Sequence, residues 1–254
     1  VGEGGWLLAC LFFIVGSLGY YGSTIFYDSL IIDVTAPENY SYVSSLGFAI
    51  GYFGGAVLLA FHVLMLTSPE TWGFDGPTAV VRFAFVTVGV WWVLFALPTL
   101  LFVHERKRAT VVRRGVVRAA YRELRSTMRC IGQYRNVVIF LIAYWLYIGG
   151  VFTVISMAVN YGQRLGFAQE DLVTALLVTN FAGFPATILY GMFGHRFGPR
   201  PGIYIAIAVY ILMSGLAVFM SEVWHFYAMA IVIGCVQGGV QGLSRSLYAS
   251  LIPA

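Results

Sequence analysis

The sequence predicts an all-α membrane protein, and three features lead to that fold class: composition, long apolar runs and clustered positive charge. Hydrophobic residues make up 59% of the 254 positions and charged residues only 10%, whereas an ordinary soluble domain carries roughly 25% charged residues. Several separate apolar runs have about 20 residues, the length that an α-helix needs to cross the hydrocarbon of a bilayer. Ten of the fifteen Lys and Arg residues lie between Arg106 and Arg135, beside such runs. This clustering is typical of a cytoplasmic loop and does not indicate nucleic-acid binding.

Seven segments are long and apolar enough to cross a membrane. They should be helices, because backbone groups in hydrocarbon must form their hydrogen bonds within the segment, and the strict alternation of barrel strands is absent. No signal-peptide pattern precedes the first segment and no Met opens the chain, so we expect the sequence to begin and end inside a longer protein. The expected spans are residues 6–31, 44–66, 79–103, 136–159, 172–193, 203–220 and 225–251.

The charged segment 104–135 is predicted to be a cytoplasmic linker that contains a basic amphipathic helix. Its apolar residues recur three or four positions apart between arginines, a pattern of helices that lie on a membrane surface. A solvated charged linker is the alternative. If this segment is cytoplasmic, the loops after the first and fifth spans lie on the same side. The apolar residues are Val112, Val116, Val117, Tyr121, Leu124 and Met128.

Polar residues form a stripe along the first span and another along the last. In the first span, Tyr20, Thr24, Tyr27 and Asp28 recur three or four positions apart and therefore share one helix face. The last span repeats the pattern. Because polar and charged side chains are costly against lipid, both stripes should face an internal cavity. The second stripe consists of Gln237, Gln241, Ser244, Arg245 and Tyr248.

Glycines recur every four residues in two of the spans. Small residues at this spacing let neighbouring helices approach closely, so we interpret them as helix-packing positions. They are Gly47, Gly51 and Gly55 in the second span, and Gly234, Gly238 and Gly242 in the last.

The two polar stripes are also related in sequence. Residues 27–31 (YDSLI) and 248–252 (YASLI) match at four of five positions, and the same offset pairs Tyr20 with Gln241 and Thr24 with Arg245. Chance remains an alternative, because Leu and Ile are abundant. A parallel repeat of six helices relates the two halves of major facilitators. We therefore interpret the chain as helices four to ten of twelve, with residues 1–103 ending the first half and 136–254 beginning the second.

The loop after the fifth span resembles the major-facilitator motif GxxxDRxGRR. Gly191, Arg196, Gly198 and Arg200 match the motif, whereas His195 stands at its acidic position and Pro199 at one of its arginines. The chain as a whole resembles the autophagy-associated vacuolar amino-acid effluxers and their bacterial relatives. The segments that carry this resemblance include FYDSLI, VSSLGFAIGYFGG and GGVQGLSRSLYASLIPA.

The resemblance implies a secondary transporter that exports a small solute, with amino acids as the expected class, through alternating exposure of a central cavity. A bacterial cytoplasmic membrane is the expected location, or a vacuolar membrane in a eukaryote. The family's Tyr-Asn-Asp-Gly signature appears as residues 147–150, YIGG, without its acidic residue, so a coupling proton has no assigned site. Tyrosine and amide groups can hydrogen-bond a polar solute. The cavity residues that we predict are Tyr20, Thr24, Tyr27, Tyr144, Asn160, Gln237 and Gln241.

Asp28 and Arg245 carry opposite charges on the two stripes near the same membrane face. We predict that they close a cytoplasmic gate as an ion pair. The alternative is that each side chain extends separately to water or to lipid phosphate. Only the first alternative makes the two residues depend on one another.

Other classes of function find less support in the sequence. An intramembrane enzyme is not expected, because HExxH is absent and Ser246 replaces the last glycine of GxSxG in residues 242–246. The three cysteines and four histidines lack metal-ligand spacing, and we expect no cofactor, no metal site and a monomer. A transport-inactive sensor or scaffold with the same fold is the remaining alternative.

Overall fold

The computed structural model describes residues 4–103 and 115–252. These residues form helices and no strand, and seven of the helices are long and apolar enough to cross a membrane. The predicted fold class and its seven spans are therefore confirmed. The long helices are α1 (Trp6–Ser29), α3 (Tyr40–Thr67), α4 (Pro77–Phe102), α6 (Arg135–Arg164), α7 (Gln169–Phe197), α8 (Pro199–Ala217) and α9 (Val223–Leu251). Short elements connect them: α2 (Ile31–Val34), η1 (Pro37–Asn39), η2 (Pro69–Trp72), α5 (Val116–Cys130) and η3 (Ile131–Gln133).

Helix ends extend beyond the apolar runs where local chemistry favours them. Helix α7 begins three residues before the predicted span, with Glu170 and Asp171 in its first turn, where the positive end of the helix dipole stabilises acidic groups. Gly198 alone separates α7 from α8 and has a φ of 84°, a left-handed conformation that other residues rarely adopt. Pro199 then begins α8, because its fixed φ suits the first turn and its missing N–H is not needed there.

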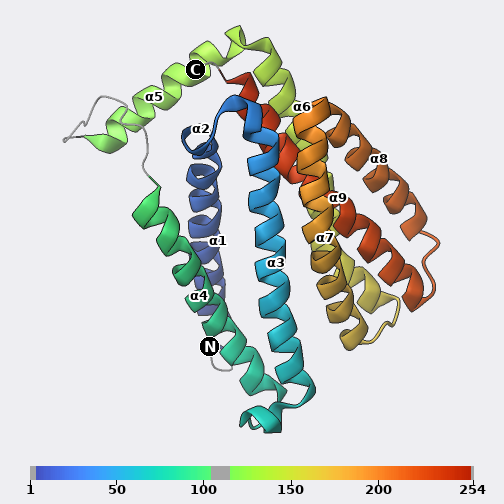
Figure 1. Ribbon diagram of the computed structural model, residues 1–254. Coiled ribbons are helices and arrows are strands. Elements are labelled where there is room, and N and C mark those ends of the chain that lie inside the picture. Colours follow the sequence, from blue (N-terminus) through green and yellow to red (C-terminus); the bar gives the residue numbers. More distant parts are fainter. Residues whose placement is uncertain (1–3, 104–114, 253–254) are drawn as a thin grey trace.

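Helix α3 lies between the two parts of the bundle. It packs along α7 and α9, while α1 and α4 lie on its other side (Figure 1). Figure 1 also shows that α2, α5 and the last turns of α9 lie at one end of the bundle, which we call the α5 end; η2 lies at the other, the η2 end. Residues 4–103 and 136–252 therefore meet mainly through α3.

Glycines on α9 permit the closest helix contacts. A Cβ atom at Gly234 would lie 2.5 Å from the carbonyl oxygen of Thr179 on α7, and one at Gly238 would collide with Thr187 on the same helix. At Gly242, a Cβ atom would lie 2.8 Å from Oγ of Ser45 on α3. These three positions thus hold α9 against α7 and α3.

The glycines of α3 have different surroundings. A Cβ atom at Gly51 would meet nothing within 4 Å, and one at Gly55 would meet only Oδ1 of Asn180, at 3.9 Å. The structure therefore brings no helix tightly against these two positions, because both border a cavity. Gly47 differs again, since its neighbours are the Tyr27 hydroxyl at 3.2 Å and the Arg245 guanidinium at 3.4 Å.

Helix α5 has one apolar and one basic face. Tyr121, Leu124 and Met128 are exposed on the apolar face. Arginines recur along the adjacent face at positions 118, 122, 125 and 129. Residues 104–114 of the predicted linker, including Val112, lie outside the described residues.

Candidate functional site

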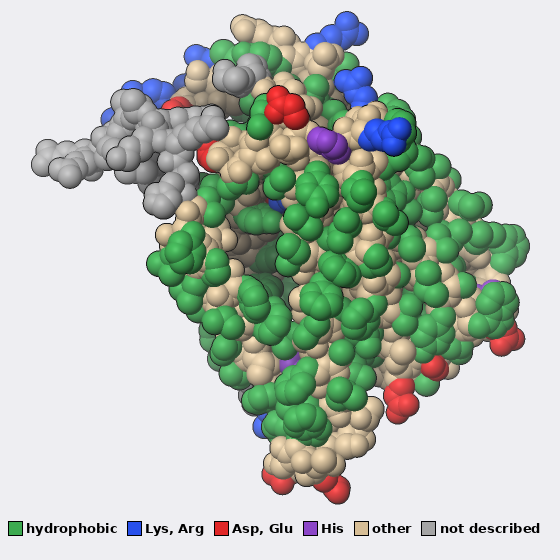
Figure 2. All heavy atoms as spheres, viewed as in Figure 1, with side chains coloured by type: hydrophobic (Ala, Val, Ile, Leu, Met, Phe, Trp, Pro, Cys, Tyr) green, Lys and Arg blue, Asp and Glu red, His purple; other side chains and the backbone are tan. Residues whose placement is uncertain are grey.

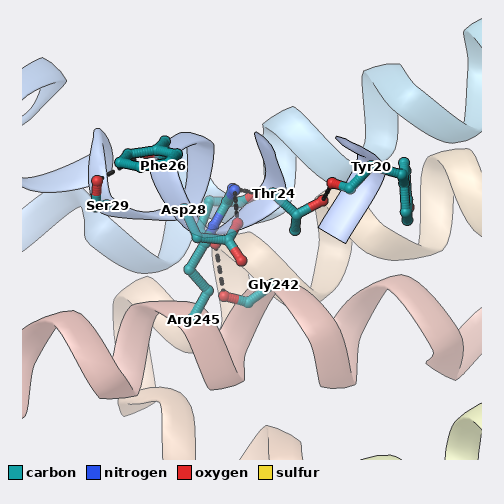
Figure 3. A network of polar contacts seen from close by, with 8 residues as sticks. Tyr20, Thr24, Phe26, Asp28, Ser29, Gly242 and Arg245 are labelled. Carbon is teal, nitrogen blue, oxygen red and sulfur yellow. Dashed lines mark hydrogen bonds and ion pairs between the residues drawn. The ribbon is translucent and has the colours of Figure 1, made fainter. Parts of the chain in front are cut away.

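Arg245 joins three helices at the α5 end of the bundle. From α9, its Nη1 donates to Oδ1 of Asp28 on α1 at 3.0 Å, and Figure 3 shows the two side chains pointing toward one another. Its Nε donates to Oγ of Ser44 on α3 at 2.8 Å, and its Nη2 donates to the Ser44 carbonyl oxygen at 2.9 Å. The Arg245 side chain is 10% exposed and that of Asp28 is 42% exposed. One guanidinium therefore connects α1 and α3 to α9.

Two aromatic rings enclose the same guanidinium. Its central carbon lies 5.1 Å from the Tyr27 ring centroid and 4.7 Å from that of Phe48, distances at which a cation is attracted to the face of a ring. Gly47 leaves room for this arrangement, as its close neighbours show. The aromatic contacts fix the orientation of Arg245 toward Asp28 and Ser44.

A row of buried serines continues this contact between α3 and α9. Ser44 donates to the carbonyl oxygen of Gly242 at 2.7 Å, and the hydroxyls of Ser41 and Ser246 lie 2.9 Å apart. Ser244 extends the row to α6, where its hydroxyl lies 2.6 Å from that of Tyr147. We call Ser41, Ser44, Ser244 and Ser246 the serine seam. Its contacts at Ser41 and Ser44 bind α3 to α9 by hydrogen bonds at the α5 end, and its contact at Ser244 binds α9 to α6.

A cavity of about 620 Å³ lies between α1, α3 and α4. Figure 2 shows the surface hollowed between α1 and α3. Aromatic side chains form much of its wall: Tyr20 stacks on Trp92 with their ring centroids 5.7 Å apart, and Trp91 lies beside them. Ser23 and His62 contribute polar groups. We call this space the α1–α4 cavity.

Two glutamines of α9 lie between α3 and a second hollow. Tyr52 on α3 donates to Oε1 of Gln241 at 2.9 Å, and its hydroxyl also lies beside Gln237, one turn away. Gln237 lines a cavity of about 290 Å³ between α6, α7, α8 and α9, whose wall is largely apolar. Four methionines, which adapt their shape easily, contribute to that wall: Met157, Met213, Met220 and Met229.

The profile of the protein family described as "Vacuole effluxer Atg22 like" matches residues 1–254. This chain belongs to that family. It is 35% identical over 249 residues to the "Uncharacterized MFS-type transporter YxiO" of Bacillus subtilis strain 168, a match that covers 98% of this chain and 58% of YxiO. It is 26% identical over 206 residues to "Autophagy-related protein 22-2" of Aspergillus oryzae, covering 69% of this chain and 34% of that protein. No solved structure matches the chain.

The match to the Atg22-like family confirms the resemblance predicted from the sequence and the multi-pass membrane character of the chain. It also confirms that the chain is not an enzyme, since the matched proteins are described as effluxers and transporters. The chain spans a little over half the length of YxiO. Among the described residues, no group of three His, Cys, Asp or Glu side chains could hold a metal ion.

The predicted cavity residues of this Atg22-like chain do not all meet in one place. Tyr20 and Gln237 line separate cavities, and the Thr24 hydroxyl donates to the carbonyl oxygen of Tyr20 in its own helix at 2.9 Å. Tyr144 stacks on Phe140, with centroids 5.7 Å apart, and lines neither cavity. Asn160 is exposed near the end of α6 and also lines neither. The spacing of these residues in the sequence shows which of them share a face of one helix, but it does not show which other helices pack against that face.

The loop motif lies at the α5 end. Gly191 is buried, and a Cβ atom there would lie 2.7 Å from that of Ser45. His195, at the motif's acidic position, donates from Nδ1 to the carbonyl oxygen of Glu38 at 3.0 Å, which ties α7 to η1. Arg196 lies over the Phe197 ring, and Arg200 borders a groove between α6, α8 and α9. Gly191 and His195 thus hold α7 against α3 and η1, whereas Arg200 lines the groove.

The sequence reasoning missed Ser41, Ser44, Tyr52 and His62 as site residues. A signal for the serines was present, because Ser41, Ser44 and Ser45 lie three and four residues apart and share one face of an apolar span. Tyr52 continues that helix toward the glutamines of α9. Ser41, Ser44 and Tyr52 matter because they supply the α3 side of the polar contacts between α3 and α9, and His62 matters because it joins α3 to Thr87 on α4.

Proposed function

We propose that this chain forms the central part of a secondary active transporter that exports a small polar solute, with amino acids as the expected class, by alternating access. It corresponds in this proposal to helices four to ten of twelve, and the α5 end faces the cytoplasm. The protein acts as a monomer, and a proton is its coupling ion. Because the chain spans 58% of YxiO, the activity belongs to a longer protein than the part described.

The observation that carries this proposal is the ion pair of Asp28 and Arg245 together with its serine contacts. They connect α1 and α3 to α9 at one end of the bundle, while the α1–α4 cavity lies toward the other end. Such an arrangement is a closed gate on one side of a solute site. Alternating access requires that the gate open while the opposite end closes.

The chemistry of the gate suits reversible opening. Breaking a buried ion pair by removing one partner typically costs about 3 to 5 kcal/mol. Here Asp28 is 42% exposed, so water can replace the guanidinium as its partner and lowers that cost. The pair is therefore strong enough to favour the closed state and weak enough to separate when a solute favours the other state.

The solute site has groups that bind without permanent charge. Tyr20 and Ser23 contribute hydroxyls to the α1–α4 cavity. On the other side of α3, Gln237 contributes an amide to the separate cavity between α6, α7, α8 and α9, and Gln241 bonds to Tyr52. These groups both donate and accept hydrogen bonds, which suits a zwitterion. The tryptophans of the cavity wall provide apolar contact for a side chain.

The experiment is amino-acid flux in sealed vesicles that contain the full-length protein. We expect flux that falls in Gln241→Ala and in Arg245→Gln at unchanged insertion. Ser29→Ala is the matched control, because that hydroxyl lies next to Asp28 yet bonds only to the Phe26 carbonyl oxygen of its own helix. Absence of flux for every amino acid, from correctly inserted protein, would remove amino acids as the solute class.

A transport-inactive sensor or scaffold is the second candidate. The exposed apolar face of α5 favours it, because Tyr121, Leu124 and Met128 contact nothing that would cover them within the described residues. In that case, replacing these three residues with serine would abolish the cellular role, while Gln241→Ala would leave it unchanged. The opposite pattern supports transport.

A further inference from the structure

His62 is a buried titratable residue that the proposed gate does not use. It lies near the η2 end of α3 and is 7% exposed. Its Nε2 lies 2.8 Å from Oγ1 of Thr87 on α4. The Thr87 hydroxyl has a single proton, and it donates that proton to its own helix, toward the carbonyl oxygens of Phe83 at 3.2 Å and Ala84 at 3.0 Å. When the Thr87 proton points to its own helix in this way, Thr87 accepts from His62 and Nε2 carries the imidazole proton.

In that arrangement the other ring nitrogen, Nδ1, is the atom that can accept a proton. His62 lines the α1–α4 cavity. In the described part of the chain, neither nitrogen of the His62 ring is both fully buried and without a hydrogen-bond partner, in contrast to the hydroxyls of Ser45, Thr187 and Tyr210. The His62 ring therefore borders the space of the α1–α4 cavity.

Among the described residues that line this cavity, His62 is the only one of the types Asp, Glu, His, Lys, Arg and Cys. The charged residues of the adjacent elements are Asp28 on α1, Glu70 in η2, Asp75 in the loop after η2 and Arg82 on α4. Asp28 pairs with Arg245 at the α5 end, and the other three are exposed. No described carboxylate forms an ion pair with His62.

A protonated His62 would therefore be a cation without a fixed counterion. Such a charge is costly inside a membrane protein, and a carboxylate on a solute in the same cavity would remove that cost. Binding of the proton and of the solute then strengthen each other by the same factor. His62 lies toward the η2 end, whereas the ion pair of Asp28 and Arg245 closes the α5 end, so the proton site and the gate are separated along the transport path.

We propose that His62 is a proton-binding residue of the α1–α4 cavity, and that its protonation is coupled to the binding of a solute carboxylate there. This inference rests on the proposed transport function for its coupling, but proton binding itself can be measured without transport. Trp91 and Trp92 line the same cavity, and their fluorescence reports a change of charge beside them.

The first arm is a fluorescence titration of purified full-length protein between about pH 5 and 8, the range in which histidine changes charge. It uses a Trp224→Phe background, because the Trp224 ring lies 4.0 Å from the ring of His225. We expect a transition that His62→Gln abolishes and His225→Gln leaves unchanged. Adding alanine should shift the transition to higher pH. A transition that persists unaltered in His62→Gln would overturn the proposal.

The second arm separates coupling from transport. In vesicles, His62→Gln should lose accumulation of solute driven by a pH gradient and keep exchange of labelled solute at equal pH. A Thr87→Val variant should retain the titration of His62 with a displaced midpoint, which shows that the site tolerates substitution. If neither the parent nor any variant moves a solute, the proposed function fails, while the titration still decides whether His62 binds the proton.

Discussion

Helix α9 makes two close interfaces that differ in kind. Against α7 it packs through Gly234 and Gly238, where backbone and side chains of the partner fill the space that a Cβ atom would need. Against α3 it also packs closely at Gly242, beside Ser45, but adds the hydrogen bonds of Ser44 with Arg245 and Gly242 and the contact of Ser41 with Ser246. The ion pair of Arg245 is with Asp28 on α1. Van der Waals contacts are lost entirely when helices separate, whereas polar groups that separate can form hydrogen bonds with water instead. The comparison predicts that the interface between α7 and α9 stays closed and that the interface between α3 and α9 can separate.

The largest expected effect is on the interface between α7 and α9. Gly238→Leu places a side chain where Thr187 and Tyr52 already lie, and we expect a loss of stability of about 3 kcal/mol, at the upper end of overpacking. The measurement is the thermal unfolding midpoint in detergent. Gly215→Leu is the control, because a Cβ atom at Gly215 meets nothing within 4 Å. Equal unfolding midpoints of Gly238→Leu and Gly215→Leu would show that close packing at Gly238 does not stabilise the interface between α9 and α7.

The interface between α3 and α9 should respond differently to loss of its charge. Arg245→Gln leaves Asp28 without its partner, and we expect the open state at the α5 end to gain about 2 kcal/mol, or roughly 30-fold in population, with little change in unfolding. Thr24→Cys, one turn from Asp28 on the cavity side, reports opening through its reaction with an impermeant thiol reagent in a cysteine-free background. The cysteines to remove are Cys10, Cys130 and Cys235.

An exchange of the two charges tests whether the residues act as a pair. Asp28→Arg combined with Arg245→Asp should recover part of the transport that each single change removes, because the attraction is restored while the contacts to Ser44 are not. Failure of the double variant to exceed either single variant would mean that each charge acts separately, through water or lipid.

A smaller effect is expected from the seam. Ser44→Ala removes the bond from Arg245 Nε and the bond to the Gly242 carbonyl oxygen, but keeps the Ser44 carbonyl as an acceptor. We expect the thiol reaction at Thr24→Cys to rise about fivefold, corresponding to roughly 1 kcal/mol for net loss of hydrogen bonding. A Ser29→Ala control should leave the reaction rate unchanged.

The smallest effect is expected at Gly51. Because a Cβ atom there would meet nothing within 4 Å, Gly51→Ala should change the unfolding free energy by less than about 0.5 kcal/mol. Gly47→Ala, with the Tyr27 hydroxyl 3.2 Å away, should instead perturb the gate. A destabilisation at Gly51 that matched the one at Gly238 would show that α3 and α9 do not differ in the way proposed.

The sequence predicted the fold and the charged part of the site, because both depend on strong local signals. Seven apolar runs of sufficient length can only be spans, and isolated charges such as Asp28 and Arg245 are conspicuous within them. Serines and a histidine are ambiguous in the same context, since they can bond to their own helix or to a neighbour. Ser44 and His62 acquire their roles only through the helices that pack against them, which periodicity does not identify.

The corner at Gly198 has a mechanical consequence. With one residue between Phe197 and Pro199, the two helices share a junction that has no slack, and its left-handed conformation resists any residue with a side chain. Helix α8 cannot slide along the bilayer normal independently of α7. Any displacement of α7 against α3 is therefore transmitted to α8, so that the two helices move together. A few residues inserted at this corner would let each helix move without the other.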